Sequence, residues 1–334
     1  MRRGAAVALV LSASLLVQAG ASERDLSLQQ LEIKAYPIQN FKIGSSETRF
    51  GRLEFVGGME MTSSSRDLGG LSAVRFLGAG TEFIGVADTG YWFAGTVKRN
   101  EAGAPVGISN FRMRAMPDGS GTRERRKWEA DAEGLLVKGD QVTASFERVH
   151  RISSGKFDAK TLDISLEDEK LPAPARELRN NKGFETLALS PEGGPLGGAR
   201  VAVTEKSLSK SGDIYAAVME GPKKGIVFVA RNGEFDITYG DFLPNGDLLL
   251  LERRFNMADG IAMRLTLVKG ADIEPGATVS GESLLEADMG YQIDNMEALD
   301  VWQDADGGTR VTLLSDDNHS ILQRNILLEF RLAQ

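Results

Sequence analysis

Acidic residues recur along this sequence at the ends of short apolar stretches, where their type and spacing suit metal binding or proton transfer. One set stands at the start of an apolar run. A second set follows the next run, after a turn rich in Gly, Asn or Asp. The first set is Ser72, Glu133, Glu185, Asp241 and Glu297, in which a serine replaces the acid once. The second set is Asp88, Glu147, Glu205, Glu252 and Asp316.

The first set also defines a repeat, because its members recur at nearly even intervals along the chain. The interval is long enough for four strands and lies close to the roughly 40 to 50 residues of known propeller blades. Each copy reads as two inner strands followed by two outer strands. The sequence therefore predicts an all-β fold, a β-propeller of about five four-stranded blades, or six if the irregular N-terminal region contains another.

The fifth copy has no fourth strand of its own before the chain ends at Gln334. Upstream of the first copy, residues 53–61 alternate between apolar and polar types in the manner of a strand. Pairing of this segment with the last copy would close the ring and remove the exposed sheet edges. We therefore expect the N-terminal strand to complete the last blade.

In a propeller the inner strands line a central channel, so their ends converge on one small region. Carboxylates gathered there raise one another's pKa unless a cation neutralises them. Oxygen ligands of this kind suit Ca²⁺ or Mg²⁺ better than zinc. The predicted metal ligands are Glu133, Glu147, Glu185, Glu205, Glu252, Glu297, Asp316 and Asn295, with Asn180, Asn181 and Asn318 as further neutral donors. The competing interpretation is that these acids cap backbone N–H groups or bind the neighbouring blade.

Basic residues directly follow three of the strand-closing acids, in Glu147-Arg148, Glu205-Lys206 and Glu252-Arg253. At a strand end, where the backbone turns, such a base is able to reach over the rim of the channel. Cations beside a metal cluster would bind an anionic ester or phosphoester. Surface or inter-blade salt bridges are the alternative. Our candidates for catalysis are Glu185, Glu297, Lys182 and Arg253.

Composition excludes several other kinds of chemistry. The chain of 334 residues contains no cysteine, which removes disulfides, thiolate nucleophiles and Cys-ligated zinc. Its two histidines are too few for a three-histidine zinc site, and it has no G-x-S-x-G nucleophile elbow. A net charge of −8 disfavours binding to nucleic acid or to an anionic membrane surface.

The N-terminal segment over 1–21 has the features of a signal peptide. Two arginines precede an apolar run over residues 5–17, and Ala19-Gly20-Ala21 forms a small-residue cleavage site. We expect a bacterial periplasmic or secreted protein, monomeric and not stably inserted in a membrane after cleavage. The predicted organisation is a signal peptide over 1–21, a leader with the closing strand over 22–64, and a propeller domain over 65–334.

Several of these motifs together resemble the phytase-like domain family, described as "esterase-like activity of phytase". The resembling motifs are Gly69-Gly70-Leu71-Ser72, Val86-Ala87-Asp88-Thr89-Gly90, Asp131-Ala132-Glu133-Gly134-Leu135, Phe146-Glu147-Arg148, Asn181-Lys182-Gly183-Phe184-Glu185, Leu249-Leu250-Leu251-Glu252-Arg253, Asp294-Asn295-Met296-Glu297-Ala298 and Leu314-Ser315-Asp316-Asp317-Asn318. They run in the expected order over roughly residues 65–332. Ala298 and Thr89 depart from the family's usual Gly and Arg, and the second departure removes a cation near the mouth.

This resemblance implies a propeller, export, and hydrolysis of phosphoesters or esters. By analogy with phytase, bound Ca²⁺ would orient a phosphate and activate a water without a covalent enzyme intermediate. The predicted partner is a small anionic ester or phosphoester. Two alternatives remain open at this point: a non-catalytic periplasmic binding or scaffold propeller, and a lactonase-like calcium propeller.

Overall fold

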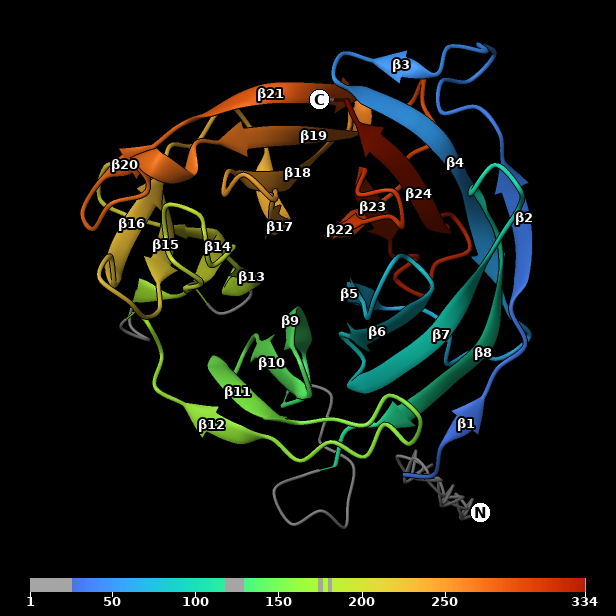
Figure 1. The fold of residues 1–334 in the computed structure, drawn as a ribbon, viewed down its shortest axis with the longest axis horizontal. Helices are drawn as coiled ribbons and strands as arrows, with labels where there is room; N and C mark the ends of the chain where they lie inside the picture. Colours follow the sequence, from blue (N-terminus) through green and yellow to red (C-terminus); the bar gives the residue numbers. More distant parts are fainter. Residues whose placement is uncertain (1–25, 118–128, 174–176, 180–181, 334) are drawn as a thin grey trace, which may run out of the picture.

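A computed structural model of the chain describes residues 26–117, 129–173, 177–179 and 182–333. The predicted signal peptide, residues 1–21, and the candidate ligands Asn180 and Asn181 lie outside these ranges. In the described ranges the strands form five sheets arranged around a centre, which confirms the predicted five-bladed β-propeller (Figure 1). No helix in the described ranges is long and apolar enough to cross a membrane.

Blades 1 and 2 are the first two repeats. Blade 1 consists of β5 (Leu71–Phe76), β6 (Glu82–Ala87), β7 (Tyr91–Arg99), β8 (Pro105–Ala115) and the short β1 (Gln29–Gln30). Blade 2 consists of β9 (Ala132–Lys138), β10 (Gln141–Phe146), β11 (Arg151–Lys156) and β12 (Glu167–Glu169). Consecutive strands pair antiparallel, so each blade is a meander that runs outward from the channel.

Blades 3 and 4 share one outer segment of the chain. Blade 3 consists of β13 (Phe184–Leu189), β14 (Arg200–Leu208), β15 (Ile214–Val218), β16 (Gly225–Val229) and β20 (Thr278–Val279). Blade 4 consists of β17 (Asp236–Phe242), β18 (Leu248–Asn256), β19 (Gly260–Val268) and β21 (Gly281–Ala287), with a 3₁₀ turn, η2 (Gly270–Asp272), between β19 and β20. The parallel pairing of β20 with β16 joins these two blades at their outer edge.

Blade 5 combines both ends of the chain. Its strands are β22 (Met296–Gln303), β23 (Thr309–Ser315), β24 (Asn325–Leu332), β4 (Leu53–Thr62) and β2 (Lys34–Ile38), with β3 (Arg49–Phe50) paired to β4. The antiparallel pairing of β4 with β24 confirms the expected closure of the ring by the N-terminal strand (Figure 1).

An aromatic cluster anchors this closing segment. Phe41 is fully buried, and its ring lies 5.0 Å from that of Phe330 in β24 and 5.0 Å from that of Tyr291. Phe50 and Phe55 complete the cluster, with ring distances to Phe41 of 5.1 and 5.6 Å. Rings at these separations stabilise beyond the area that they bury, by about 0.5–1.5 kcal/mol per pair.

The apolar core lies between neighbouring blades, because each sheet buries both faces against the next one. Leu136 of β9 packs in one cluster with Leu187 of β13, and Val203 of β14 packs in another with Leu250 of β18. Apolar residues along β9, β13, β14 and β18 therefore pack on both faces of their blade, one against the preceding blade and one against the following blade.

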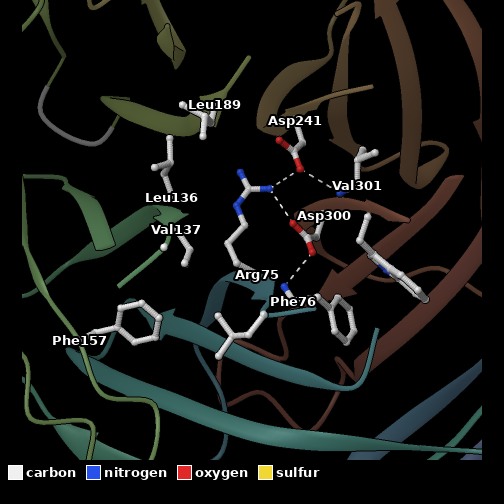
Figure 2. A pocket seen from close by; sticks show the side chains of 12 residues that line it. Arg75, Phe76, Leu136, Val137, Phe157, Leu189, Asp241, Asp300 and Val301 are labelled. Carbon is white, nitrogen blue, oxygen red and sulfur yellow. Dashed lines mark hydrogen bonds and ion pairs between the residues drawn. The ribbon is translucent and has the colours of Figure 1, made fainter. Parts of the chain in front are cut away.

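One arginine joins all five blades at the end of the channel where the inner strands finish. Arg75 of β5 donates from Nε to Leu135 O of blade 2 and from Nη2 to Leu187 O of blade 3, each at 2.8 Å. Its Nη1 lies 2.6 Å from Oδ2 of Asp241 in blade 4 and 2.9 Å from Oδ1 of Asp300 in blade 5 (Figure 2).

The two carboxylates around this arginine are themselves fully engaged. Asp241 also accepts the N–H groups of Val301 and Phe242, while Asp300 accepts that of Phe76. Burial raises the pKa of Asp241 to about 6, although the positive charge of Arg75 opposes this shift. A cavity of about 430 Å³ opens beside these groups, but their hydrogen bonds are already made within the protein.

Removal of the arginine tests whether this contact supports the ring. The change Arg75→Met should lower the free energy of unfolding by about 3–5 kcal/mol, since it leaves two buried carboxylates without their cation. Urea unfolding measures this change. As a matched control, Arg331→Met removes a half-exposed cation 3.8 Å from Asp304 and should cost less than about 1 kcal/mol. Equal costs for the two variants would contradict the role assigned to Arg75.

Candidate functional site

Each inner strand carries one extra residue near its start, and this β-bulge determines which side chains face the channel. The shift in pairing register falls at the same place in all five blades. The residues at the bulges are Ser72, Glu133, Glu185, Thr238 and Glu297. Side chains alternate along a regular strand, so one extra residue brings positions three apart to the same face. The bulge residues therefore share the channel with Arg75, Asp241 and Asp300 at its other end.

The observed register corrects the equivalence predicted for the fourth repeat. Thr238, and not Asp241, occupies the position of the strand-opening acids, so the step from Glu185 is shorter than predicted and the step to Glu297 is longer. The prediction was wrong because this copy has no acid at its bulge, and the nearest acid further along the strand is Asp241. The hydroxyl of Thr238 instead donates to Met296 O of the next blade at 2.9 Å.

The same shift applies to the strand-closing set. Ile237 pairs with Glu252 just as Phe184 pairs with Thr204, so Arg253 is the counterpart of Glu205. Glu252 points to the opposite face, where it accepts hydrogen bonds from Arg264 at 2.6 Å and from a threonine hydroxyl. The structure thus does not bring Glu252 to the other predicted ligands.

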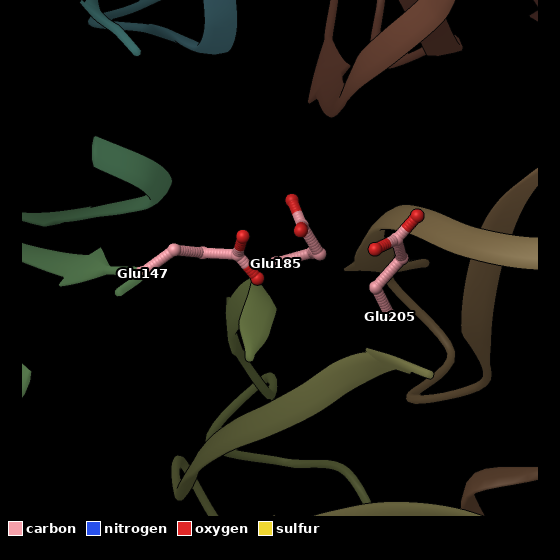
Figure 3. A group of neighbouring side chains, drawn as sticks. All are labelled: Glu147, Glu185 and Glu205. Atoms are coloured by element: carbon pink, nitrogen blue, oxygen red, sulfur yellow. The ribbon is translucent and has the colours of Figure 1, made fainter. Parts of the chain in front are cut away.

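Three predicted ligands from two blades gather at the mouth. Glu147 follows β10, Glu185 lies at the bulge of β13, and Glu205 lies on β14 (Figure 3). One carboxylate oxygen from each lies within 4.8 Å of the others, and all three side chains are buried. We call Glu147, Glu185 and Glu205 the acid cluster.

The members of the acid cluster differ in how they are satisfied. Glu147 accepts the backbone N–H of Gly183 at the start of blade 3, and the absence of a side chain on Gly183 leaves room for the ring of His150 beside this bond. Glu205 pairs with Lys182 at 2.5 Å and lies 3.9 Å from Arg253. For Glu185, by contrast, no hydrogen-bond donor is found among the described residues.

Burial and mutual repulsion make Glu185 and Glu147 costly to ionise. Burial, followed by the charges of Glu133 and Glu147, raises the pKa of Glu185 well above its usual range. Burial likewise raises the pKa of Glu147 to about 7, although its bond with Gly183 opposes the shift. Burial is also the largest cause of the raised pKa of Glu133, which no described donor contacts. A bound cation would relieve this cost.

Two further predicted ligands border the cluster but have partners of their own. Glu297 accepts hydrogen bonds at Oε1 from Arg253 at 2.6 Å and from Asn295 at 2.7 Å, which leaves Oε2 without a described donor. Its pKa is raised, chiefly by burial. Asp316 accepts the N–H of Leu71 at 3.1 Å and so connects blade 5 to blade 1.

A cavity of about 810 Å³ opens beside the acid cluster and was not predicted from the sequence. It shares Lys182, Glu205, Arg253 and Asn295 with the site just described. Its remaining charged and apolar lining includes Lys206, Arg231, Glu234, Asp236, Arg254, Phe255, Ile261 and Leu322. Lys206 at 2.6 Å and Arg231 at 3.2 Å share the single carboxylate of Asp236. The lining thus has five cations and three acids, and it suits an anion.

The three bases that follow strand-closing acids all form ion pairs. Arg148 pairs with Asp131 within blade 2, whereas Lys206 and Arg253 pair across blades, with Asp236 and Glu297. The inter-blade salt bridges considered from the sequence are therefore present. Lys206 and Arg253 nevertheless line the cavity as well, so that a structural contact and contact with a ligand are compatible for them.

The donor set fits a calcium ion. Carboxylate oxygens from Glu147, Glu185 and Glu205 are hard ligands, and Glu185 has no described hydrogen-bond donor to satisfy it. In the part of the chain that the structure describes, the ligands grouped here are all carboxylates, and the chain has no cysteine, which favours calcium over zinc or copper.

Comparison with protein families gives a match over most of the chain. The model of the phytase-like family, "Esterase-like activity of phytase", matches residues 66–319. The chain belongs to this family. The matched range contains the bulge residues, the acid cluster and most of the cavity lining, so these features belong to the family's domain. Comparison with curated protein sequences finds no match.

Solved structures with a similar course of the chain are distant in sequence. The endo-arabinase of Bacteroides thetaiotaomicron is 12% identical, with a TM-score of 0.48, over 79% of this chain and 94% of that one. A PQQ-bound aldose sugar dehydrogenase from Streptomyces coelicolor is 11% identical, with a TM-score of 0.45, over 85% and 99%. The Malassezia sympodialis allergen Mala s 1 is 9% identical, with a TM-score of 0.40, over 78% and 92%.

Neutralising Glu185 should have two opposite effects that a purely structural role would not combine. In metal-free protein, Glu185→Gln should raise the melting temperature, because it removes a buried charge among like charges. With calcium present, the variant should lose most of the calcium-induced rise in melting temperature that a folded-state ligand causes. Glu252→Gln is the control and should lower stability while the response to calcium persists. An unchanged calcium response in Glu185→Gln would contradict the site.

The raised pKa of Glu147 predicts a pH dependence of stability. Its folded pKa of about 7 exceeds the unfolded value of about 4.5, so the folded state binds more protons between these limits. The ionised side chain therefore destabilises the fold fully above about pH 7 and not at all below about pH 4.5. Urea unfolding in chelator should show Glu147→Gln more stable than the natural protein at pH 8, with the difference shrinking toward pH 5. A pH-independent difference would contradict this assignment.

Proposed function

We propose that this protein is a metal-dependent hydrolase of small anionic esters, with phosphoesters first and carboxylic esters second, and that its metal is calcium. One observation carries the proposal: the cation-lined cavity opens directly onto a cluster of carboxylates and shares Glu205 with it. Sites that cleave phosphoesters combine these two features, a cation held by carboxylates and side-chain cations for the substrate's charge.

Calcium would be held by Glu147, Glu185 and Glu205. The negative charges of Glu133 and Glu297 act on Glu185 and would add to the attraction for the ion. When bound, the ion would neutralise these carboxylates and polarise an oxygen of the substrate or of a water.

The chain's own residues would bind and orient the ester. Lys182 and Arg253 stand between the acid cluster and the cavity, and each is already held by a carboxylate, Glu205 or Glu297. This fixed position lowers the entropy lost when they bind an anion.

Proton transfer would fall to Glu297. Its Oε1 is occupied by Arg253 and Asn295, while its Oε2 is available to accept a proton from an attacking water. A raised pKa brings this carboxyl closer to the range in which a general base is effective at neutral pH. The water oxygen would bond to phosphorus or carbon as the ester bond to the alcohol oxygen breaks, and Glu297 would pass the proton taken from the water to the leaving alcohol oxygen.

The proposal includes export. It rests on the charged, apolar and small-residue sequence of residues 1–21, which is typical of a signal peptide. Calcium is abundant outside the cytoplasm, so a site of modest affinity would be filled in the periplasm or after secretion. Within the proposal the protein acts as a monomer.

A non-catalytic binding propeller is the second candidate, and one observation favours it. Glu147 and Asp316 each accept a backbone N–H of the next blade, which is a structural use of a conspicuous acid. A lactonase-like activity would employ the same site on a cyclic ester. Assays on different substrates separate these possibilities.

Hydrolysis of nitrophenyl phosphate, nitrophenyl acetate and a panel of lactones, each with calcium and with chelator, tests the proposal. We expect calcium-dependent turnover of the phosphate ester. Arg253→Met should lower kcat/KM by at least about tenfold through lost anion binding, whereas Lys156→Met, an exposed cation on β11, should have no effect. No turnover of any ester by protein with confirmed bound calcium would contradict a hydrolase and favour the binding propeller. Turnover of lactones alone would favour the lactonase.

A further inference from the structure

The cavity beside the acid cluster has an apolar side as well as a cationic one. Phe255 at the end of β18, Ile261 in β19 and Leu322 in the loop before β24 contribute apolar surface to its lining. Phe255 is 66% exposed and Leu322 is 86% exposed. These side chains therefore stay in water unless a ligand covers them.

Exposed apolar side chains are common singly, but two strongly exposed ones, Phe255 and Leu322, line the same cavity. Among the described residues, ten large apolar side chains are exposed, and five of them lie at the end of β18 or in connections of blades 4 and 5. The five are Phe255, Met257, Met289, Ile321 and Leu322. Met289 packs against the β18–β19 hairpin, at Gly260. Exposed apolar side chains that line a polar cavity mark a binding surface.

Cations line the same cavity. Lys206 and Arg231 share Asp236, so one carboxylate faces two positive charges there, and Arg253 lies at the boundary with the acid cluster. A ligand that satisfies the cavity must therefore place a negative group toward these cations and an apolar group toward Phe255 and Leu322.

We propose that the substrate is an amphiphile: a soluble phosphoester, or another anionic ester, whose alcohol or acyl part is apolar. This inference rests on the proposed function and narrows its substrate class. A polyhydroxylated, multiply phosphorylated substrate would satisfy the cations but leave the apolar wall in water. Each methylene that reaches the wall contributes up to about 0.8 kcal/mol, so an apolar tail of a few carbons decides the preference.

Binding of unreactive phosphonates tests the inference without requiring turnover. Calorimetric titration of calcium-loaded protein with hexylphosphonate and with methylphosphonate compares the same anion with and without a tail. We expect hexylphosphonate to bind at least about tenfold more tightly. Phe255→Ser and Leu322→Ser should each reduce that preference several-fold and leave the affinity for methylphosphonate unchanged.

Ile321→Ser is the matched control. Ile321 is adjacent to Leu322 and fully exposed, but it lines a different cavity, with His319 and Arg324, and should keep the preference for hexylphosphonate. Equal affinities for the two phosphonates, or equal effects of the three variants, would overturn the inference even if esters are hydrolysed. A preserved preference with no hydrolysis of hexyl phosphate or glycerol phosphate would instead count against the proposed function alone.

Discussion

The geometry of the whole ring depends on a single buried guanidinium. Arg75 bonds to backbone oxygens of blades 2 and 3 and to carboxylates of blades 4 and 5, and it comes itself from blade 1. Five sheets that meet at a centre would otherwise leave strand carbonyls and N–H groups unpaired there. The arginine donates to the carbonyls, and its partners Asp241 and Asp300 accept the N–H groups of Val301, Phe242 and Phe76. Together these bonds fix the distances between the inner strands. This end of the channel is thereby a structural joint, with its charges balanced inside the protein.

The other end of the same strands has the opposite character. A bulge at the start of each inner strand turns Glu133, Glu185 and Glu297 into the channel, two or three positions before the residues of the same strands that contact Arg75, which are Leu135, Leu187 and Asp300. Among the described residues no hydrogen-bond donor contacts Glu185, and burial raises its pKa and those of Glu133 and Glu147. Such a cluster lowers the free energy of unfolding, and a cation that binds only the folded state raises it again. One repeated backbone feature therefore supplies both the joint and the candidate site.

Much of this arrangement was predictable from the sequence, because a repeat of blade length and alternating apolar residues determine a blade. The five blades, the closure by β4 and the convergence of Glu147, Glu185 and Glu205 followed from it. The predicted positions of Asp241 and Glu252 were wrong. A bulge changes by one residue which side chains face the channel, and the fourth repeat has Thr238 at its bulge, so that no acid indicates the bulge in the sequence. The joint at Arg75 was missed. Its only sequence signal is one arginine in an otherwise apolar strand. The cavity depends on loops from three blades and had no local signal.

Direct measurement of calcium binding is the sharpest test of the claim that the acid cluster holds a cation. Calorimetric titration at pH 7 should show about one ion per chain, with a dissociation constant of about 1 mM or tighter and with release of protons from the cluster. Glu185→Gln should abolish this binding, and Glu252→Gln should retain it. No binding to the natural protein at millimolar calcium, or binding that survives in Glu185→Gln, would contradict the account.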